Sequence, residues 1–421
     1  MQLDQTDPVV QQVKKNLSEI FGDRFDQQHF VVAVSGGGDS MAMLYAFAAL
    51  VPTGRLQVVS VNHHFRAEAA DELALVERAC HSLGVAWQAG HWEWDGKGNL
   101  QAAAREGRWA ILKAIAQANR SSAVLIGHTE DDQIENFFLR LARGSGVDGL
   151  AGIQLSSHRD GIQIVRPLLS IGRQELRAWL TRNGIEWADD PTNEDSAYGR
   201  IRARQMMAQL KDLGLTRKRV LQTVEHMRSA SEALDTATRQ FVHDRCRTEC
   251  GDVIIGLSEE DFDNREIFLR AATKAIQWVG GQVYKPRYES LVSAIDLVLN
   301  GKRNTLSGCV LSRENNRLRM GRELSAVENT LKCTGDGPFI WDHRWIVETS
   351  KPIDHGEIRA LGEDGLAHCL NWRQIGAPRH TLLTTPSVWA NDTLIAAPIA
   401  GYENGWTAQI AADFADWLVT H

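Results

Sequence analysis

The stretch VVAVSGGGDSMAML, residues 31–44, decides the fold of the N-terminal part of the chain. Four apolar or small residues run directly into Ser35 and three consecutive glycines, and apolar residues at helical spacing follow. This pattern predicts a strand, a tight turn and a helix. Glycine leaves no Cβ between the backbone and a ligand, and the first turn of a helix has backbone N–H groups without helical partners. An anion is therefore the expected occupant of the loop.

Apolar runs and helical patterns continue to alternate after the glycine loop. The expected elements are strands at 56–61, 85–92 and 123–127 and helices at about 67–83, 99–119 and 131–142. This alternation is typical of βαβ units that build a parallel sheet. Ligands of such sheets bind beyond the carboxyl ends of the strands, so the loops 35–40 and 127–132 are expected to face one cleft.

The remaining sequence suggests two further domains. A Gly-rich stretch at 143–152 breaks the helical pattern, and an apolar run at 162–169 leads to a helix that ends near Asn183 and Gly184. A long polar helical segment follows. The predicted organisation is an α/β catalytic domain with a parallel, Rossmann-like sheet at 1–215, a mainly helical middle domain closed by a short hairpin at 216–325, and a small β-rich domain at 326–421.

Composition limits the class of protein. A hydrophobic content of 43% in 421 residues is enough for about two or three cores. The formal net charge of −7 argues against a uniformly basic nucleic-acid coat but allows a local basic patch. Six cysteines without a C-x-x-C pair indicate neither a zinc ribbon nor a redox couple. No signal-peptide pattern or apolar stretch of about 20 residues is present, so a cytoplasmic location is expected.

The glycine loop does not fit the two commonest nucleotide-binding patterns. A P-loop needs a lysine before its final hydroxyl residue. This loop has no lysine, and Ser40 is followed by Met41. A dinucleotide fingerprint needs a third, spaced glycine that is missing here. Backbone amides and two hydroxyls could instead hold a pyrophosphate, with one carboxylate positioning Mg²⁺. The predicted binding set is Ser35, Gly36, Gly37, Gly38, Asp39 and Ser40.

The SGGGDS loop after a hydrophobic strand resembles the pyrophosphate-binding loop of the N-type ATP pyrophosphatases, or PP-loop proteins. Four further stretches resemble the tRNA(Ile)-lysidine synthetase family in the same order and at similar spacing. They are NLQAAAREGRWAIL (99–112), IGHTEDDQIENFFLRLARGSGVDGLAGI (126–153), IVRPLL (164–169) and WADDPTNEDSAYGRIRAR (187–204). The resemblance is strong over about 28–210 and weaker to the end, where SVWANDTLIAAPIAG (387–401) resembles the terminal domain of the family.

This resemblance implies a ligase that uses ATP and Mg²⁺. Such an enzyme adenylates C2 of the wobble cytidine in the isoleucine tRNA with a CAU anticodon, and the ε-amine of free L-lysine then displaces AMP. The product, lysidine, changes codon reading from AUG to AUA, and the reaction releases AMP and pyrophosphate. The implied partners are this tRNA and free lysine, with no membrane. The sequence leaves the oligomeric state open, a homodimer being one option.

The resemblance also implies roles for acidic residues near the start of one helix. Asp39, Asp132, Glu135 and His128 would serve catalysis, His128 through contact with the nucleotide, and Asp39 and Asp132 would bind metal. Asp132 and Glu135 are three residues apart and so lie on one helix face. The alternative interpretation is an acidic helix N-terminus favoured by the helix dipole. Asn136 stands where the family usually has threonine.

Arginines are the second group with implied roles. Arg105 and Arg108 would face ATP and the cytidine phosphates, because a guanidinium fork grips phosphate well. Trp109 stands where the family usually has tyrosine. Arg200 is assigned to the target base or ATP, although GRIRAR permits two alignments that also allow Arg202 or Arg204. Solvated surface charge is the alternative for each arginine.

Basic and aromatic residues elsewhere are candidate RNA contacts. The candidate phosphate contacts are Lys14, Lys15, Arg217, Lys218, Arg219, Arg287, Lys302 and Arg303. The candidate base-stacking residues are Trp372, Arg373, Arg379 and His380. Three other functions stay open at this point: a tRNA thiolase of the same fold, a small-molecule amide ligase, and a nucleotide sensor that lacks the chemistry.

Overall fold

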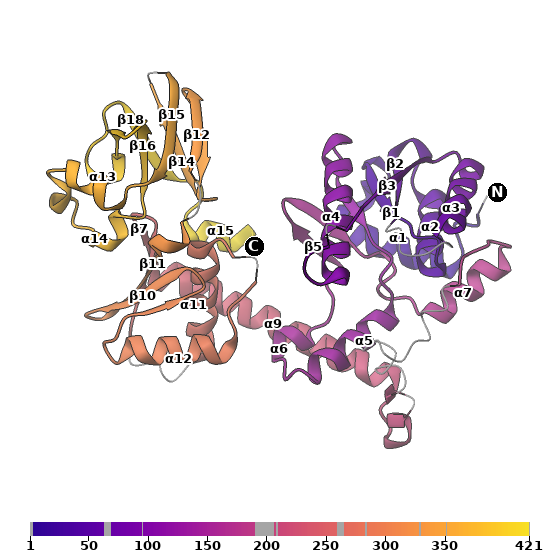
Figure 1. Ribbon diagram of the computed structural model, residues 1–421. Coiled ribbons are helices and arrows are strands. Elements are labelled where there is room, and N and C mark those ends of the chain that lie inside the picture. Colours follow the sequence, from indigo (N-terminus) through magenta and orange to yellow (C-terminus); the bar gives the residue numbers. More distant parts are fainter. Residues whose placement is uncertain are drawn as a thin grey trace. The chain divides into compact units, whose positions relative to one another are not determined.

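The protein forms two compact units, Met1–Ser231 and Glu232–His421 (Figure 1). The structure is a computed structural model that describes residues 3–62, 69–94, 96–189, 206–207, 209–258, 265–282, 284–327, 330–350 and 352–420. The border between the units falls inside the long helix α9, Arg217–Arg245. The three-domain division expected from the sequence stays a prediction.

A six-stranded sheet is the centre of the first unit, with strand order β3-β2-β1-β4-β6-β5. Its strands are β1 (Phe30–Ala33), β2 (Leu56–Asn62), β3 (Ala86–His91), β4 (Ala123–Leu125), β5 (Ser156–Arg159) and β6 (Ile162–Val165). Five strands run parallel, with Phe30 opposite both Leu56 and Ala123, and only the edge strand β5 is antiparallel. The predicted parallel sheet is therefore confirmed.

Alternating residues of β1 explain why helices cover both faces of the sheet. Phe30 and Val32 are buried in one hydrophobic core, whereas Val31 is buried in another on the opposite face. Helices α1 (Pro8–Phe21), α2 (Gly38–Leu50), α3 (Ala69–Leu83) and α7 (Arg173–Arg182) contribute to the first core. Helix α4 (Leu100–Ala118) contributes to the second. Because β1 is buried on both faces, its sequence is a continuous apolar run.

Helix α5 (Glu130–Leu141) carries the acidic stretch and packs against α9. Its apolar residues Ile134, Phe137 and Phe138 form a small core with Val220 and Val224 of α9. The short helix α6 (Val147–Leu150) follows α5. The first turns of α9 thus belong to the packing of the first unit.

The second unit contains a five-stranded antiparallel sheet in the order β7-β8-β11-β10-β9. Its strands are β7 (Cys246–Glu249), β8 (Asp252–Gly256), β9 (Asn304–Leu306), β10 (Cys309–Glu314) and β11 (Arg317–Arg322). Helices α11 (Arg265–Gly280), α12 (Tyr288–Leu299) and α15 (Phe414–Thr420) share its core. The hairpin that the sequence predicts is β10-β11, and β7, β8 and β9 extend it.

Two small antiparallel sheets make up most of the C-terminal part. One has the order β12-β15-β16-β17 and the other β13-β14-β18. Their strands are β12 (Leu331–Gly335), β13 (Phe339–Trp341), β14 (Trp345–Thr349), β15 (Ile353–Ala360), β16 (Pro386–Ala390), β17 (Thr393–Ala396) and β18 (Trp406–Ile410), and helices α13 (Gly362–His368) and α14 (Arg379–Leu382) accompany them. The β-rich character predicted for this region is confirmed. Among the described residues, no helix combines the length and apolar character needed to cross a membrane.

A buried polar network joins the C-terminal part to the five-stranded sheet. Arg319 of β11 lies 3.1 Å from Asp252 of β8, and Thr381 of α14 donates a hydrogen bond of 2.5 Å to the same carboxylate. Burial raises the pKa of Asp252 to about 6, against the opposing effects of Thr381 and Arg319. Such a network is costly to break, because each group left behind would be buried without compensation.

Candidate functional site

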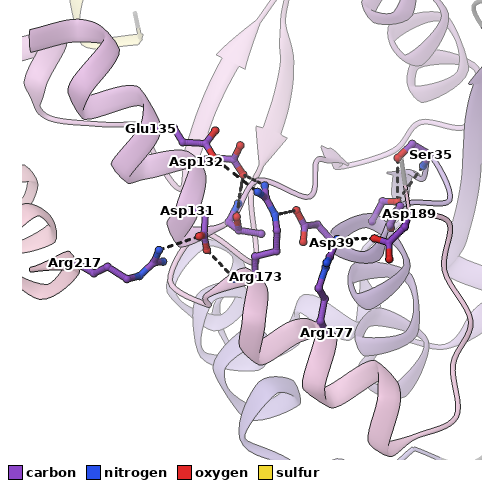
Figure 2. A network of polar contacts seen from close by, with 12 residues as sticks. Ser35, Asp39, Asp131, Asp132, Glu135, Arg173, Arg177, Asp189 and Arg217 are labelled. Atoms are coloured by element: carbon purple, nitrogen blue, oxygen red, sulfur yellow. Dashed lines mark hydrogen bonds and ion pairs between the residues drawn. The ribbon is translucent and has the colours of Figure 1, made fainter. Parts of the chain in front are cut away.

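The glycine loop connects β1 to α2, and Ser40 closes it from inside. The buried Ser40 hydroxyl accepts a hydrogen bond from the Ser35 amide at 3.1 Å and donates one to the Gly37 carbonyl at 2.8 Å. Ser35 is exposed, with its Oγ 3.2 Å from that of Ser40 (Figure 2). Ser40 thus shapes the loop, while Ser35 is accessible to a ligand. Their roles in pyrophosphate binding stay predictions.

The backbone requires a glycine at one position of this loop, and a second glycine marks its contact with the loop after β4. Gly36 has φ +91°, and a Cβ there would lie 3.3 Å from the carbonyl oxygen of Glu72. Gly127 lies beside the glycine loop, since a Cβ there would be in ordinary van der Waals contact, 3.4 Å from Cα of Ser40 and 3.5 Å from the carbonyl carbon of Asp39. The two loops that the sequence analysis expects in one cleft are thus in contact.

One guanidinium joins the acidic residues of the two loops. Arg173, the first residue of α7, donates from Nε to Oδ2 of Asp39 at 2.8 Å (Figure 2). Its terminal nitrogens lie 3.8 Å from Oδ2 of Asp132 and 3.7 Å from Oε1 of Glu135. Asp132 and Glu135 are buried, with 6% and 2% exposure, while Asp39 is half-buried. Three predicted catalytic carboxylates therefore meet at one cation.

The electrostatics of this cluster differ between its members. Burial raises the pKa of Asp39, and neighbouring Asp132 adds to this, although Arg173 acts in the opposite direction. Burial lowers the pKa of Arg173, but Asp39, Asp132 and Glu135 outweigh it, so the pKa is raised and the guanidinium stays charged. Asp39 is thus a carboxylate whose charge a further cation would stabilise.

Asp132 has a second role that is structural. Its Oδ2 accepts hydrogen bonds from the amide of Thr129 at 2.8 Å and from the Thr129 hydroxyl at 3.0 Å. Thr129 is the N-cap of α5, and Asp132 occupies the third helical position, so the pair forms a capping box. Helix capping and catalysis are therefore both open to this carboxylate, and a metal held by it would use the other oxygen.

Two substitutions can separate these roles of Asp132. We expect Asp132→Ala to lower the free energy of unfolding by about 1 kcal/mol, because it removes the carboxylate half of the capping box and leaves the Thr129 amide without this acceptor. Asp132→Asn keeps an acceptor oxygen and should lose much less. Both remove the negative charge, so both should slow ATP cleavage to a similar extent. Urea denaturation and an assay of AMP release test this. Equal loss of stability in the two variants would contradict the capping role.

Asp131 fixes the position of Arg173 through the backbone. Its Oδ2 accepts the Arg173 amide at 2.8 Å, and its Oδ1 accepts Nη1 of Arg217 at 2.9 Å. Burial raises the pKa of Asp131, but these hydrogen bonds outweigh it and hold the pKa below its ordinary value. Arg217 also pairs with Glu130 at 2.9 Å. A candidate phosphate contact from the sequence, Arg217, is thus engaged by carboxylates of α5.

A second group of arginines lies on α4 and directly after β6. Arg105 and Arg108 are exposed on α4. Arg166, directly after β6, donates to the Gln154 carbonyl at 2.8 Å and is half-buried. Burial, followed by repulsion from Arg105, lowers the pKa of Arg166 to about 10, so it stays protonated at neutral pH. The assignment of Arg105 and Arg108 to phosphates stays a prediction.

Other predicted residues fall at or beside the site. His128 is half-buried in the loop before α5. Trp109 donates its indole N–H to Asp160 at 2.7 Å, so the residue in the usual tyrosine position holds the edge hairpin in place. The catalytic candidate Arg200 and its alternatives Arg202 and Arg204 lie outside the described residues.

Sequence reasoning missed Arg173 and Arg166. Arg166 lies inside the quoted motif IVRPLL, but nothing in that motif alone indicates its role. Arg173 carried a signal, because a cation at the first position of a helix is disfavoured by the helix dipole and calls for acidic partners. Those partners come from two other segments, and only the fold brings them together.

The donor set fits a magnesium ion that is bound together with a nucleotide. Within the described ranges, no group of three or more His, Cys, Asp or Glu side chains is arranged to hold a metal alone. Asp39 and Asp132 offer carboxylate oxygens that both lie beside the guanidinium of Arg173. Mg²⁺ in nucleotide enzymes is commonly held by one or two carboxylates, substrate phosphates and water. The site matches this pattern better than that of a resident metal centre.

The candidate RNA contacts lie in different surroundings. Lys14, Lys15, Lys218, Arg287 and Lys302 are exposed. Figure 1 shows α12, which Arg287 precedes, in the second unit. Several of the other candidates are paired. Arg303 lies 3.2 Å from His380, and Arg379 forms an ion pair with Glu363. The guanidinium of Arg373 lies over the ring of Trp372, 4.6 Å from its centroid. A stacked guanidinium and indole form a flat surface suited to an unpaired base.

Comparisons with known proteins show the family of the chain. A family model described as a PP-loop domain matches residues 9–211. The tRNA(Ile)-lysidine synthase of Ruegeria pomeroyi is 40% identical over 396 residues, which cover 93% of this chain and 94% of the relative. The tRNA(Ile)-lysidine synthase of Wolbachia pipientis is 33% identical, covering 76% and 77%.

A solved structure is also similar. The U34-tRNA thiolase NcsA from Methanococcus maripaludis matches with a TM-score of 0.44 and 17% identity, over 52% of this chain and 80% of that one. The assignment rests instead on the sequence relatives, one of which matches almost from end to end. On the identity and extent of this match, the chain belongs to the tRNA(Ile)-lysidine synthase family.

Proposed function

We propose that this protein uses ATP to adenylate C2 of the wobble cytidine of the CAU-anticodon isoleucine tRNA and joins free L-lysine to it. The observation that carries the proposal is the meeting of Asp39, Asp132 and Glu135 beside the glycine loop. It occurs in a chain 40% identical to a tRNA(Ile)-lysidine synthase over nearly its whole length. ATP binding follows from the family, and Mg²⁺ and lysine are finer parts of the proposal.

The first step is attack of the cytidine O2 on the α-phosphorus of ATP, with pyrophosphate as the leaving group. Negative charge grows on the leaving pyrophosphate, and the loop amides and the N-terminus of α2 would stabilise it. No lysine accompanies the loop to serve γ-phosphoryl transfer. Asp39 and Asp132 would hold Mg²⁺, which supplies charge stabilisation on the phosphate oxygens when it is bound.

The second step is attack of the lysine ε-amine on C2. The new C–N bond forms, the bond between C2 and the adenylated oxygen breaks, and AMP leaves with that oxygen. The amine must lose a proton to attack, and a carboxylate within reach can accept it. Glu135 is the candidate acceptor, because it is buried beside the site and lies farther from Arg173 than Asp39 does.

Mass spectrometry of tRNA nucleosides tests the proposal directly. Bulk tRNA is incubated with the protein, ATP and lysine, and the nucleosides are then examined for cytidine that has gained lysine with loss of water. Omission of lysine and use of elongator methionine tRNA are the controls. We expect AMP and pyrophosphate to form in step with the modified nucleoside. Accumulation of ADP, or unmodified tRNA in the complete mixture, would reject the proposal.

A further inference from the structure

Arg173 is an unusual residue for the place it occupies. It is the first residue of α7, where the helix dipole disfavours a cation. Two features compensate for this cost: Asp131 accepts its backbone amide, and three carboxylates surround its side chain, of which 22% is exposed. The backbone of Arg173 is therefore fixed independently of its guanidinium.

The contacts of the guanidinium are unequal. It makes a direct hydrogen bond of 2.8 Å to Asp39, whereas the ion pairs with Asp132 and Glu135 are 3.8 and 3.7 Å long. Release of Asp39 would thus cost one hydrogen bond and leave two carboxylates to stabilise the charge. Any metal ion that uses Asp39 has to compete with this cation for the same carboxylate.

We propose that Arg173 is an exchangeable counter-ion of Asp39: it holds this carboxylate before ligands bind and yields it when ATP and a divalent cation enter together. The inference rests on the proposed function for its assignment of Asp39 to metal. Its consequence is ordered loading, because a metal ion alone meets a positive charge at the site. The phosphates of ATP add negative charge, which favours the divalent cation over Arg173 in the competition for Asp39.

Binding of Mn²⁺ without nucleotide tests this role. The probe is Mn²⁺ alone, whose free concentration is measured by electron paramagnetic resonance. We expect Arg173→Met to bind Mn²⁺ on the order of tenfold more tightly than the unaltered protein, because it removes a positive charge beside the metal position. Arg173→Lys keeps the charge and should bind as weakly as the unaltered protein. Arg173→Gln repeats the neutral substitution if the methionine variant does not fold.

A matched control lies one turn further along α7. Arg177 pairs with Asp189 at 2.6 Å and is largely exposed, so Arg177→Met removes an arginine from the same helix without touching Asp39. It should leave Mn²⁺ binding unchanged. In the double variant Arg173→Met with Asp39→Asn, the gain should disappear, because the carboxylate that binds the metal is gone.

The outcomes separate this inference from the proposed function. Unchanged Mn²⁺ affinity in the neutral Arg173 variants, or an equal gain in Arg177→Met, would overturn the counter-ion role. A gain that persists in the double variant would also overturn it, because the metal would then not use Asp39. None of these titrations requires the ligase reaction. Failure of the proposed function would appear separately, as unmodified tRNA in the nucleoside assay.

Discussion

Asp39→Asn is expected to reduce the rate of ATP cleavage to AMP and pyrophosphate by about 10²-fold or more. Asp39 lies at the start of α2, directly after the glycines, and is the carboxylate that would orient Mg²⁺ against the growing charge on the pyrophosphate. Asparagine has the same shape and keeps an oxygen that can accept from Arg173. The change therefore removes charge with little loss of packing. Release of AMP and pyrophosphate from labelled ATP measures the effect.

The same variant is expected to fold. Burial raises the pKa of Asp39, so the folded protein binds this proton more tightly than the unfolded chain does. As pH rises from the ordinary carboxyl pKa through the raised one, ionisation of Asp39 lowers the stability of the folded state. The ionised carboxylate is thus kept at a cost in stability, which fits a functional role.

Asp189→Asn provides the matched control for this experiment. Asp189 is an exposed carboxylate that pairs with Arg177 of α7, and it makes none of the contacts of the acidic cluster. The control should cleave ATP at a rate close to that of the unaltered protein. A near-normal rate in Asp39→Asn itself would mean that Asp39 acts only as an acidic residue at a helix N-terminus.

Local patterns were enough to predict the part of the fold that carries the site. The apolar run that includes Val31 and Val32 and the glycines after it predicted β1, the loop and α2, because each of these elements is encoded by neighbouring residues. The spacing of Thr129 and Asp132 also fits a capping box, a local signal. By contrast, Arg173 and Asp39 are 134 residues apart, so their contact depends on the whole sheet.

The second unit shows a different limit of sequence analysis. The hairpin β7-β8 follows a long polar helix without a break, and its turn contains Cys250 and Gly251 at φ +50° and +85°. Cysteine is not a usual residue for a left-handed turn position, so the stretch lacked the Asn-Gly or Asp-Gly signal of a tight hairpin. The β10-β11 hairpin carried Asn315 and Asn316 at its turn and was predicted.

Removal of the second unit is expected to leave ATP binding intact and to weaken tRNA binding by about 100-fold or more. A cytidine and its loop are small targets, and discrimination between tRNAs needs contacts elsewhere on the RNA. The second unit carries exposed candidates for such contacts, among them Arg287 and Lys302. The shortened chain would also neutralise fewer phosphates, so its residual binding should depend less steeply on salt.

The structure determines where the chain should be cut. Val220 and Val224 of α9 pack on Ile134, Phe137 and Phe138, and these contacts lie within the first unit. A chain that ends at Ser231 keeps this small core, whereas one that ends near residue 215 exposes it and should be less stable. The stability of α5 matters for the experiment, because the helix carries Asp132 and Glu135.

Filter binding to isoleucine and elongator methionine tRNAs across a salt series compares the full chain with the chain ending at Ser231. ATP binding by the shortened chain is the internal control, because it shows that the glycine loop and α5 are still in place. Loss of both ATP and tRNA binding would indicate unfolding and would call for a longer fragment of α9. Equal tRNA affinity and equal selectivity in the two proteins would instead assign the second unit a role other than tRNA recognition. Recognition would then have to come from the exposed basic residues of the first unit, of which Lys14, Lys15 and Lys218 are the next to be replaced.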